Sequence, residues 1–268
     1  MDMQLVMLGT GHAMVTKCYN TCFAFRNDNE YLMVDAGGGN GIMAQLEKAE
    51  IPYTNIHNMI VTHGHTDHVL GVIWMVRKIA TLISNNKYTG EFTIYCHDEL
   101  VKTITTFCEL TLPGKLFNLI GNGITIREVV NGEQIKIMGI DVQFFDIASK
   151  KQKQFGFSTT LPNGKKLACL GDEPYNESNK IYVENCDWML SEAYCLYSDK
   201  DIFKPYEKYH STALDAGKLA EQLNIKNLLL YHTEDSNLIE RKMRYTNEAK
   251  TVFSGNVFVP NDLEKIQL

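Results

Sequence analysis

Short runs of hydrophobic residues alternate with polar turns along this chain, a pattern typical of β-strands separated by loops. The run at 4–8 ends at a Gly-Thr-Gly turn, and the runs at 22–26 and 31–35 flank a polar cluster, which predicts a hairpin. Further strands are predicted at 58–61, 92–96, 124–130, 134–137, 141–147, 154–161, 166–171, 188–193, 227–231 and 256–259. The core is therefore expected to be built around β-sheet.

Helices are predicted where hydrophobic residues recur three or four positions apart. One follows the glycines at 37–39, with Ile42, Met43, Leu46 and Ala49 on one stripe. Others are predicted at 70–83, 99–110, 211–223 and 236–250. No linker, low-complexity tract or repeat interrupts this order, so the sequence predicts one α/β domain over 1–268, a sheet sandwich with helices outside.

Composition narrows the class of protein. The 268 residues are 44% hydrophobic and 22% charged, which excludes a disordered chain, a collagen and a coiled coil. A net charge of -6 argues against a broad basic surface for nucleic acid. Seven cysteines without a C-x-x-C pair indicate reduced thiols. Neither a signal peptide nor a membrane-spanning run is recognisable, so we expect a cytoplasmic protein without a membrane partner.

The most specific motif is His-Gly-His-Thr-Asp-His at 63–68, which holds three of the eight histidines. It follows a predicted strand and precedes a predicted helix. Imidazole and carboxylate groups bind zinc and other divalent metals. Six adjacent residues cannot direct four ligands at one tetrahedral ion, but they can supply two neighbouring ions, one taking His63 and His65 and the other Asp67 and His68. The alternative is a polar loop with incidental histidines.

Around this motif the chain resembles metallo-β-lactamase-fold hydrolases, in particular their ribonuclease Z-like branch, over nearly its whole length. Weaker matching motifs are Leu8-Gly9-Thr10-Gly11, Asn20-Thr21, the segment 32–37, Gly171-Asp172, His210-Ser211-Thr212 and Tyr231-His232-Thr233. The resemblance implies a four-layer αββα sandwich with its metal site where strand ends meet. It also implies two divalent metal ions, zinc in the first place, with manganese or iron as alternatives.

The resemblance assigns further site residues to strand ends. Asp172 is expected to bridge both ions, because a carboxylate has two oxygens, and His232 is expected to be the last ligand. Asp35 is expected to orient a ligand from behind. Each position also has a purely structural alternative: a turn residue for Asp172, a core histidine for His232 and a strand-end cap for Asp35.

One position departs from the family pattern. The usual third ligand of the first metal is a histidine on the strand before the bridging aspartate. Here no histidine lies between His97 and His210, and Asp146 stands in the expected place. We expect Asp146 to bind the metal, which would shift the preference from zinc toward manganese or iron. The alternative is a half-occupied site.

The resemblance gives His210 a catalytic role near the leaving group, where an imidazole donates a proton or stabilises charge. Glu192 is expected to set its tautomer, and a helix-cap histidine is the alternative. The aromatic segment 203–209 is expected to form one wall of the pocket, with Tyr206 and Tyr209 available for stacking. A cluster of lysines after Asp146 either binds an anion near the metals or forms a solvated turn. They are Lys150, Lys151 and Lys153, with Lys165 and Lys166 across the hairpin.

These residues predict a dinuclear-metal-dependent hydrolase, most readily a phosphodiesterase that uses a metal-bridging hydroxide oriented by Asp67, with His210 assisting the leaving group. Two alternatives are a hydrolase of lactones or other carboxylic esters and a non-catalytic metal-binding protein. The expected substrate is a small or short phosphodiester, for example a cyclic nucleotide. The resemblance also implies that a ribonuclease of this branch would carry an RNA-gripping arm between the third-ligand strand and the bridging aspartate. Here one hairpin fills the interval from Asp146 to Asp172 and leaves no room for the arm, and the net charge of -6 gives no general attraction to a polyanion, so folded transfer RNA is disfavoured. Homodimer formation is left open.

Overall fold

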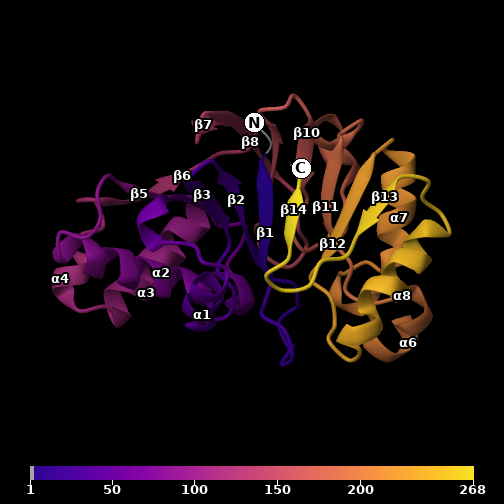
Figure 1. Ribbon diagram of the computed structural model, residues 1–268, viewed down its shortest axis with the longest axis horizontal. Helices are drawn as coiled ribbons and strands as arrows, with labels where there is room; N and C mark the ends of the chain where they lie inside the picture. Colours follow the sequence, from indigo (N-terminus) through magenta and orange to yellow (C-terminus); the bar gives the residue numbers. More distant parts are fainter. Residues whose placement is uncertain (1–2) are drawn as a thin grey trace.

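Two seven-stranded sheets pack face to face in the computed structural model, which describes residues 3–268 (Figure 1). The first sheet has the order β14-β1-β2-β3-β4-β5-β6 and the second the order β13-β12-β11-β10-β9-β8-β7. The first comprises β1 (Gln4–Gly9), β2 (Cys22–Asn27), β3 (Glu30–Val34), β4 (Ile56–Ile60), β5 (Phe92–Cys96), β6 (Ile124–Glu128) and β14 (Lys265–Gln267). The second comprises β7 (Gln134–Ile137), β8 (Ile140–Asp146), β9 (Phe155–Thr160), β10 (Lys166–Cys169), β11 (Trp188–Glu192), β12 (Asn227–Tyr231) and β13 (Asn256–Phe258).

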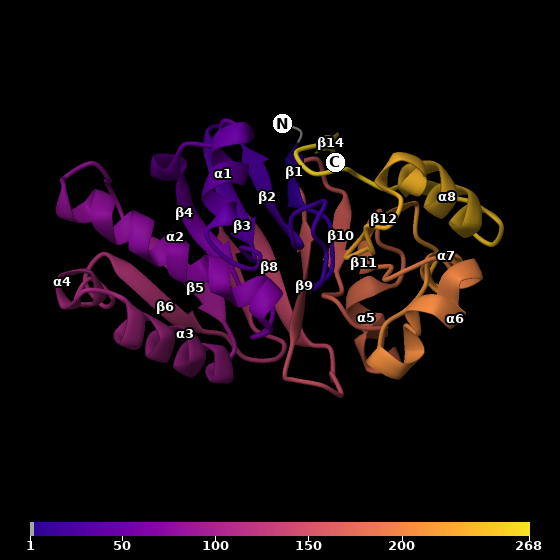
Figure 2. The same cartoon turned by 90° about the horizontal axis from the view of Figure 1, so that it is seen from below.

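Helices cover the outer face of each sheet (Figure 2). Beside the first sheet lie α1 (Gly41–Lys48), α2 (Thr66–Ser84), α3 (Asp98–Thr111) and α4 (Gly114–Phe117). Beside the second lie α5 (Lys180–Val183), α6 (Lys200–Phe203), α7 (Ala213–Gln222) and α8 (Leu238–Lys250). The 3-10 turns are η1 (Tyr53–Asn55), η2 (Glu177–Asn179), η3 (Tyr197–Asp199) and η4 (Tyr206–Lys208). The predicted αββα sandwich is therefore confirmed.

Strands buried on both faces explain the continuous hydrophobic runs of the sequence. In β1, Leu5 and Met7 point into the layer between the sheets, whereas Val6 and Leu8 pack under the helices of the first sheet. Successive side chains of a strand point to opposite faces, so both sets must be apolar. Between the sheets, Phe25 meets Phe157 edge to face, with ring centroids 6.2 Å apart.

The topology brings several strand ends to one edge of the sandwich. Strands β3 to β6 pair in parallel, and so do β10 to β13. Parallel strands end at the same edge, where side chains from loops distant in the sequence meet. Asp35 follows β3, the 63–68 motif follows β4, Asp172 follows β10, Glu192 ends β11 and His232 follows β12.

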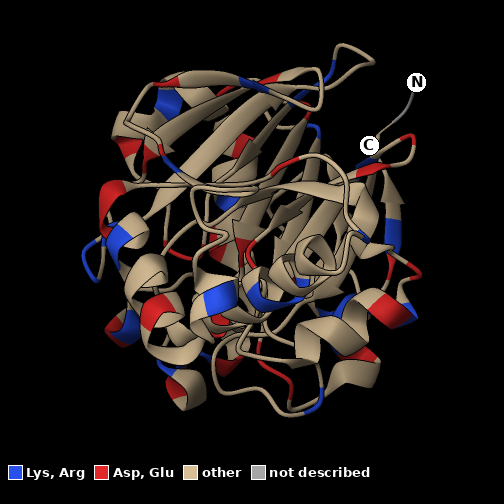
Figure 3. Cartoon of the chain, turned by 90° about the vertical axis from the view of Figure 1, so that its left-hand side faces the viewer, with Lys and Arg blue, Asp and Glu red and all other residues tan. Residues whose placement is uncertain are grey.

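The surface and the helices bear on two further expectations. On the side that Figure 3 shows, acidic and basic positions are interspersed over helices and loops. The basic positions therefore do not form one continuous group on that side. Within residues 3–268, none of the helices combines the length and hydrophobicity needed to cross a bilayer.

Candidate metal centre

The 63–68 motif connects β4 to α2. His65 is the N-cap residue of α2, and Asp67 and His68 lie on its first turn. A carboxylate at this position interacts favourably with the positive end of the helix dipole. The loop and the first helical turn direct all four side chains to one place, so that the rings of His63 and His68 have centroids 4.1 Å apart.

Four atoms form the first group of candidate ligands: Asp67 Oδ2, His68 Nε2, Asp172 Oδ2 and His232 Nε2. Each of the two oxygens lies 3.4–3.5 Å from each of the two nitrogens. Ligands bound tetrahedrally at about 2.1 Å from zinc are themselves about 3.4 Å apart, so these atoms fit one divalent ion. His68 Nε2 is buried and has no hydrogen-bond partner, as expected of an atom reserved for a metal.

Three atoms form the second group. His63 Nε2 lies 2.9 Å from His65 Nδ1 and 3.4 Å from Asp172 Oδ2. The same Asp172 oxygen thus belongs to both groups, which is the arrangement of a carboxylate that bridges two ions. With three protein atoms, this second group leaves a tetrahedral position for a water molecule or a substrate.

Asp35 holds the ring of His68, one of the candidate ligands, from the side opposite Nε2. Its Oδ2 accepts hydrogen bonds from His68 Nδ1 at 2.8 Å and from Thr62 Oγ1 at 2.7 Å, and its Oδ1 accepts one from Thr62 N at 2.8 Å. A proton on Nδ1 leaves Nε2 of His68 free to bind a metal. Asp35 and His232 both adopt a left-handed backbone, with φ of 55° and 57°. Such conformations cost energy in residues other than glycine and are concentrated at functional sites.

Gln154 is a site residue that the sequence did not reveal. Its side chain is buried, its Nε2 donates a short hydrogen bond to Asp172 Oδ1, and the same nitrogen lies 2.7 Å from His63 Nδ1. These contacts fix the Asp172 carboxylate so that Oδ2 faces the other ligands. A lone glutamine before an aromatic strand carries no recognisable signal of this role.

The sequence predicts that Asp146 lies among the metal ligands, but the structure places it elsewhere. Asp146 ends β8 opposite Phe155, and its Oδ1 accepts a hydrogen bond from Ala148 N at 2.8 Å. Within the described residues, no group of candidate ligands includes it. The carboxylate caps its own turn because Ala148, with φ of 55°, directs the chain into a loop that returns at Gln154.

His210 lies beside the metal ligands without belonging to the two groups above. Its Nδ1 is 3.5 Å from Oε2 of the fully buried Glu192, and its Nε2 is 3.3 Å from Lys151 Nζ. The ring stacks on Tyr194, with centroids 4.7 Å apart, and Tyr194 stacks in turn on His12 at 4.5 Å. These contacts hold the His210 ring in one orientation, with Nδ1 facing a carboxylate.

A cavity of about 680 Å³ opens over the ligands. Besides ligand residues it is lined by His12, Met14, Lys151, Tyr194, Glu207, Lys208, Tyr209 and His210. Of the two tyrosines expected to stack on a substrate, Tyr209 lines the cavity, whereas Tyr206 does not and donates a hydrogen bond to Asp215 at 2.7 Å. Lys153 is also directed elsewhere, with its Nζ 2.5 Å from Asp98.

His12 is a second residue that sequence analysis left without a role. Burial, with His232 and His210 nearby, lowers the pKa of His12 to about 4, so the ring is neutral near pH 7. Its Nδ1 accepts a hydrogen bond from Met14 N at 3.1 Å, which places the proton on Nε2. The one available signal was its place in the Gly-Thr-Gly-His turn directly after β1.

The carboxylates and His65 have the protonation states that bind metals, whereas His68 does not. Burial alone would lower the pKa of His68, but Asp67 and Asp35 outweigh it and raise that pKa well above its usual value, so a metal that binds there displaces a proton. Burial alone would raise the pKa of Asp67, but His68 and His232 outweigh it and hold that pKa well below its usual range. Asp172 behaves in the same way, with His63 as the main opposing partner. Burial lowers the pKa of His65 to about 4. Ionised carboxylates and a neutral imidazole are the forms that bind metals.

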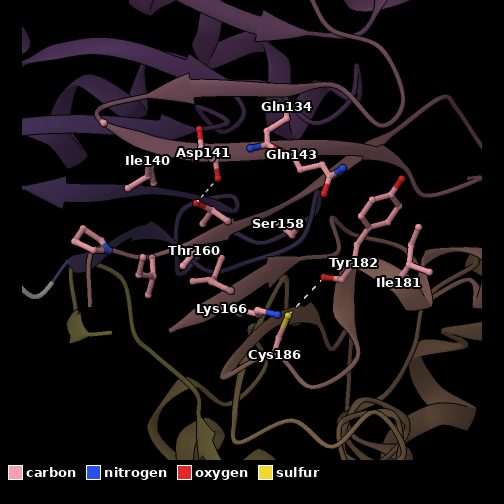
Figure 4. Close-up of a pocket in the computed structure, with 15 residues that line it drawn as sticks. Gln134, Ile140, Asp141, Gln143, Ser158, Thr160, Lys166, Ile181, Tyr182 and Cys186 are labelled. Atoms are coloured by element: carbon pink, nitrogen blue, oxygen red, sulfur yellow. Dashed lines mark hydrogen bonds between the residues drawn. The ribbon is translucent and has the colours of Figure 1, made fainter. Parts of the chain in front are cut away.

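A further cavity, of about 490 Å³, lies on the face of β8 to β10 and beside Ile181 and Tyr182 (Figure 4). Its polar lining includes Gln143, Ser158 and Lys166. Within the described part of the chain, no group of candidate metal ligands lines it. The site chemistry is therefore assigned to the strand-end cavity.

The sandwich and its strand-end cluster of histidines and aspartates define a metallo-β-lactamase-fold, metal-dependent hydrolase that is similar to ribonuclease Z. More particularly, the chain belongs to the family of the anti-Pycsar protein Apyc1, whose model matches residues 3–258. It is 24% identical to ribonuclease Z of Thermococcus sibiricus over 99% of this chain and 96% of that protein. It is 26% identical to ribonuclease Z of Oceanobacillus iheyensis over 99% of this chain and 100% of that protein.

Solved structures show the same fold. The metallo-β-lactamase-fold protein YhfI from Bacillus subtilis superimposes with a TM-score of 0.80 at 20% identity, covering 100% of both chains. The short form of human tRNase Z gives a TM-score of 0.76 at 21% identity and covers 98% of both chains. A diphosphatase of the PhnP family also gives 0.76, at 16% identity, and covers 100% of this chain and 98% of that one.

Proposed function

We propose that this protein is a dinuclear-metal-dependent phosphodiesterase that acts on small phosphodiesters. The observation that carries the proposal is the position of Asp172 Oδ2, which lies 3.4–3.5 Å from ligand nitrogens of both groups. Two divalent ions held at such a site supply a water molecule of lowered pKa as nucleophile and polarise the phosphoryl oxygen. The nitrogen and oxygen donors and their near-tetrahedral spacing favour zinc.

The residues around the ligands supply the remaining chemistry. His210 is the group that moves a proton: it lines the cavity, and its Nδ1 lies 3.5 Å from Oε2 of Glu192 on the side away from Lys151. Asp67 orients the attacking water from the first group of ligands. His12 offers Nε2–H as a neutral donor on the wall formed with Tyr194.

Several observations support a small substrate over folded RNA. The cavity of about 680 Å³ is in the range typical of small-molecule sites. Between β8 and Asp172 the chain forms only a loop and the β9–β10 hairpin, so this interval contributes no protruding arm. The relatives named ribonuclease Z and the PhnP-family diphosphatase support the reaction on phosphorus–oxygen bonds and do not support a small substrate over RNA. A cyclic nucleotide or another short diester is therefore the substrate class that we propose.

The test combines metal analysis with a substrate panel. The protein is loaded with Zn²⁺ or Mn²⁺ and assayed on bis(p-nitrophenyl) phosphate, cyclic nucleotides, p-nitrophenyl phosphate, a lactone and precursor transfer RNA. We expect two metal equivalents per chain, turnover of the small diesters, and loss of that turnover with a chelator. Efficient cleavage of precursor transfer RNA with poor activity on small diesters would contradict the proposed substrate, and turnover of the lactone alone would contradict the proposed reaction.

A further inference from the structure

Lys151 lies in the cavity between two site residues. Its Nζ is 3.3 Å from His210 Nε2 and 3.7 Å from Glu173 Oε1, and its side chain is 21% exposed. An ammonium group has three N–H donors. One faces His210 and one faces Glu173, so a third is left for a ligand in the cavity.

Glu173 fixes the loop that carries this lysine. The Glu173 side chain is buried, and its Oε1 accepts a hydrogen bond from Ser149 Oγ at 2.6 Å. Its Oε2 accepts another from Lys150 N at 3.2 Å, and Ser149 Oγ accepts one from Lys151 N at 3.2 Å. Glu173 directly follows Asp172, so the loop is attached to the strand end that carries the shared ligand.

The charge of Lys151 reaches the metal ligands. Lys151 lines the same cavity as the candidate ligands His65, Asp67 and Asp172. A cation at this place adds to the positive charge that two bound ions would supply. An anionic ligand gains from it, whereas an uncharged ester has no anionic oxygen to pair with it.

We propose that Lys151 binds a non-bridging oxygen of an anionic phosphodiester and that Glu173 positions it, so that the site selects a charged diester over an uncharged ester. This inference rests on the proposed function and names the residue that gives it specificity. Lys151 is a binding residue, because it contacts the substrate. Glu173 is a positioning residue, because it acts through the loop.

Lys153 provides a matched control in the same loop. It has the same charge and lies two residues further along, but its Nζ pairs with the exposed Asp98 at 2.5 Å and it does not line the cavity. Replacing Lys153 by methionine therefore removes one positive charge from the loop without removing a cavity donor.

The experiment compares metal-loaded wild type, Lys151→Met and Lys153→Met on bis(p-nitrophenyl) phosphate and on the uncharged p-nitrophenyl acetate. Loss of a charge-assisted hydrogen bond predicts that Lys151→Met lowers kcat/KM for the diester by about 10- to 100-fold, mainly through KM. The acetate rate and both rates of Lys153→Met should change by less than about twofold. Calorimetric binding of inorganic phosphate gives a second readout, with a similar 10- to 100-fold weakening in Lys151→Met alone.

The role of Glu173 is tested by measuring KM and kcat separately in two variants. Glu173→Gln should raise KM for the diester and leave the acetate rate near that of wild type, and Glu173→Asp, which keeps the charge, should restore part of the loss. Equal effects of Lys151→Met and Lys153→Met, or a parallel loss on both substrates, would overturn the inference. A wild type that binds two metals but cleaves no diester would instead overturn the proposed function, and the phosphate-binding comparison would still decide the role of Lys151.

Discussion

The two halves of the candidate metal centre differ in how completely the chain encloses them. In the half built by Asp67, His68, Asp172 and His232, four atoms from three separate strand ends surround one position at near-tetrahedral spacing. In the half built with His65, three protein atoms leave one position open. Metal sites with a full set of protein ligands are typically structural, and sites with an open position are catalytic. In the dinuclear site that we propose, the comparison therefore predicts one tightly held ion and one exchangeable ion.

The two halves also differ in the hydrogen bonds that hold their candidate ligands in place. His68 donates from Nδ1 to Asp35, and Asp35 is itself held by two hydrogen bonds from Thr62. His65 is only partly buried, and within the described residues the one hydrogen-bonding contact of its side chain is with His63. A ligand oriented from behind loses less freedom when it binds a metal. The enclosed half is therefore better pre-organised than the open half.

Removing the shared atom should have the largest effect. Asp172→Ala deletes the oxygen common to both halves, so we expect loss of at least one metal equivalent and a fall in turnover of roughly 10³-fold or more. Metal analysis and diester turnover measure the two effects. Asp172→Asn, which keeps the shape but not the charge, is the matched control and should retain more metal. Full metal content in Asp172→Ala would exclude Asp172 as a ligand.

Removing His210 should affect chemistry without affecting either half. His210→Ala is expected to lower kcat on small diesters by about 10²- to 10⁴-fold, the usual loss for a proton-transfer group, with both metals retained. Diester kinetics and metal analysis on the same preparation are the measurements. Loss of a metal equivalent in this variant would mean that His210 belongs to the ligand set, through its proximity to His232 and Glu192.

The sequence predicted best those features that are local. The 63–68 motif is recognisable because its residues are adjacent, whereas Asp35, Asp172 and His232 are predicted from the family resemblance, with support from their positions after hydrophobic runs. The αββα layers followed from the order of these runs together with the family resemblance. Strand β14 is not predicted, because Ile266 is the one hydrophobic residue among its three and forms no hydrophobic run.

Features created by tertiary approach were not predictable. Gln154 meets His63 and Asp172 only because a loop returns it to the cluster after β8, and His12 reaches the cavity only through its stacking on Tyr194. Asp146 was chosen because it ends a strand. Its carboxylate is instead taken up by the turn at Ala148, a local contact that strand periodicity does not indicate.

Removing one ligand from each half tests the comparison directly. His65→Ala should lose the ion of the open half and keep one equivalent, whereas His232→Ala should weaken the tightly held ion by more than about 100-fold. Stepwise titration of the loaded protein with a chelator measures this, and wild type should release its ions in two phases. A single phase in wild type, or equal retention by the two variants, would show that the halves are equivalent.

A smaller effect is expected from residues behind the ligands. Gln154→Ala frees the Asp172 carboxylate and should weaken metal binding by about 10- to 100-fold, as is usual for groups that orient a ligand. Asp146→Ala, at the other end of the same loop, should leave metal affinity within about twofold of wild type. Competition with a metal-binding dye compares the two. Metal loss in Asp146→Ala would instead support the ligand role that the sequence suggested.

The smallest effect is expected from replacing His97. This change tests how much of the decrease in unfolding free energy at low pH comes from a histidine outside the candidate ligands. His97 follows β5, is fully buried, and has no hydrogen-bond partner on either ring nitrogen within the described structure. Burial, with the charge of Lys153, lowers the pKa of His97 to about 4.

An exposed histidine in the unfolded chain has a pKa of about 6.5. As the pH falls from about 6.5 to 4, the unfolded state therefore binds a proton that folded His97 does not, and the free energy of unfolding must decrease. In metal-free protein, His97→Leu should remove this contribution, which amounts to at most about 1.4 kcal/mol per pH unit. Thermal unfolding between pH 4 and 7 measures the slope, whatever the absolute stability of the variant. Parallel curves for wild type and variant would show that His97 takes up its proton equally in both states. They would leave His12 and the candidate ligand His65, whose pKa values are each lowered to about 4, as main sources of the acid sensitivity.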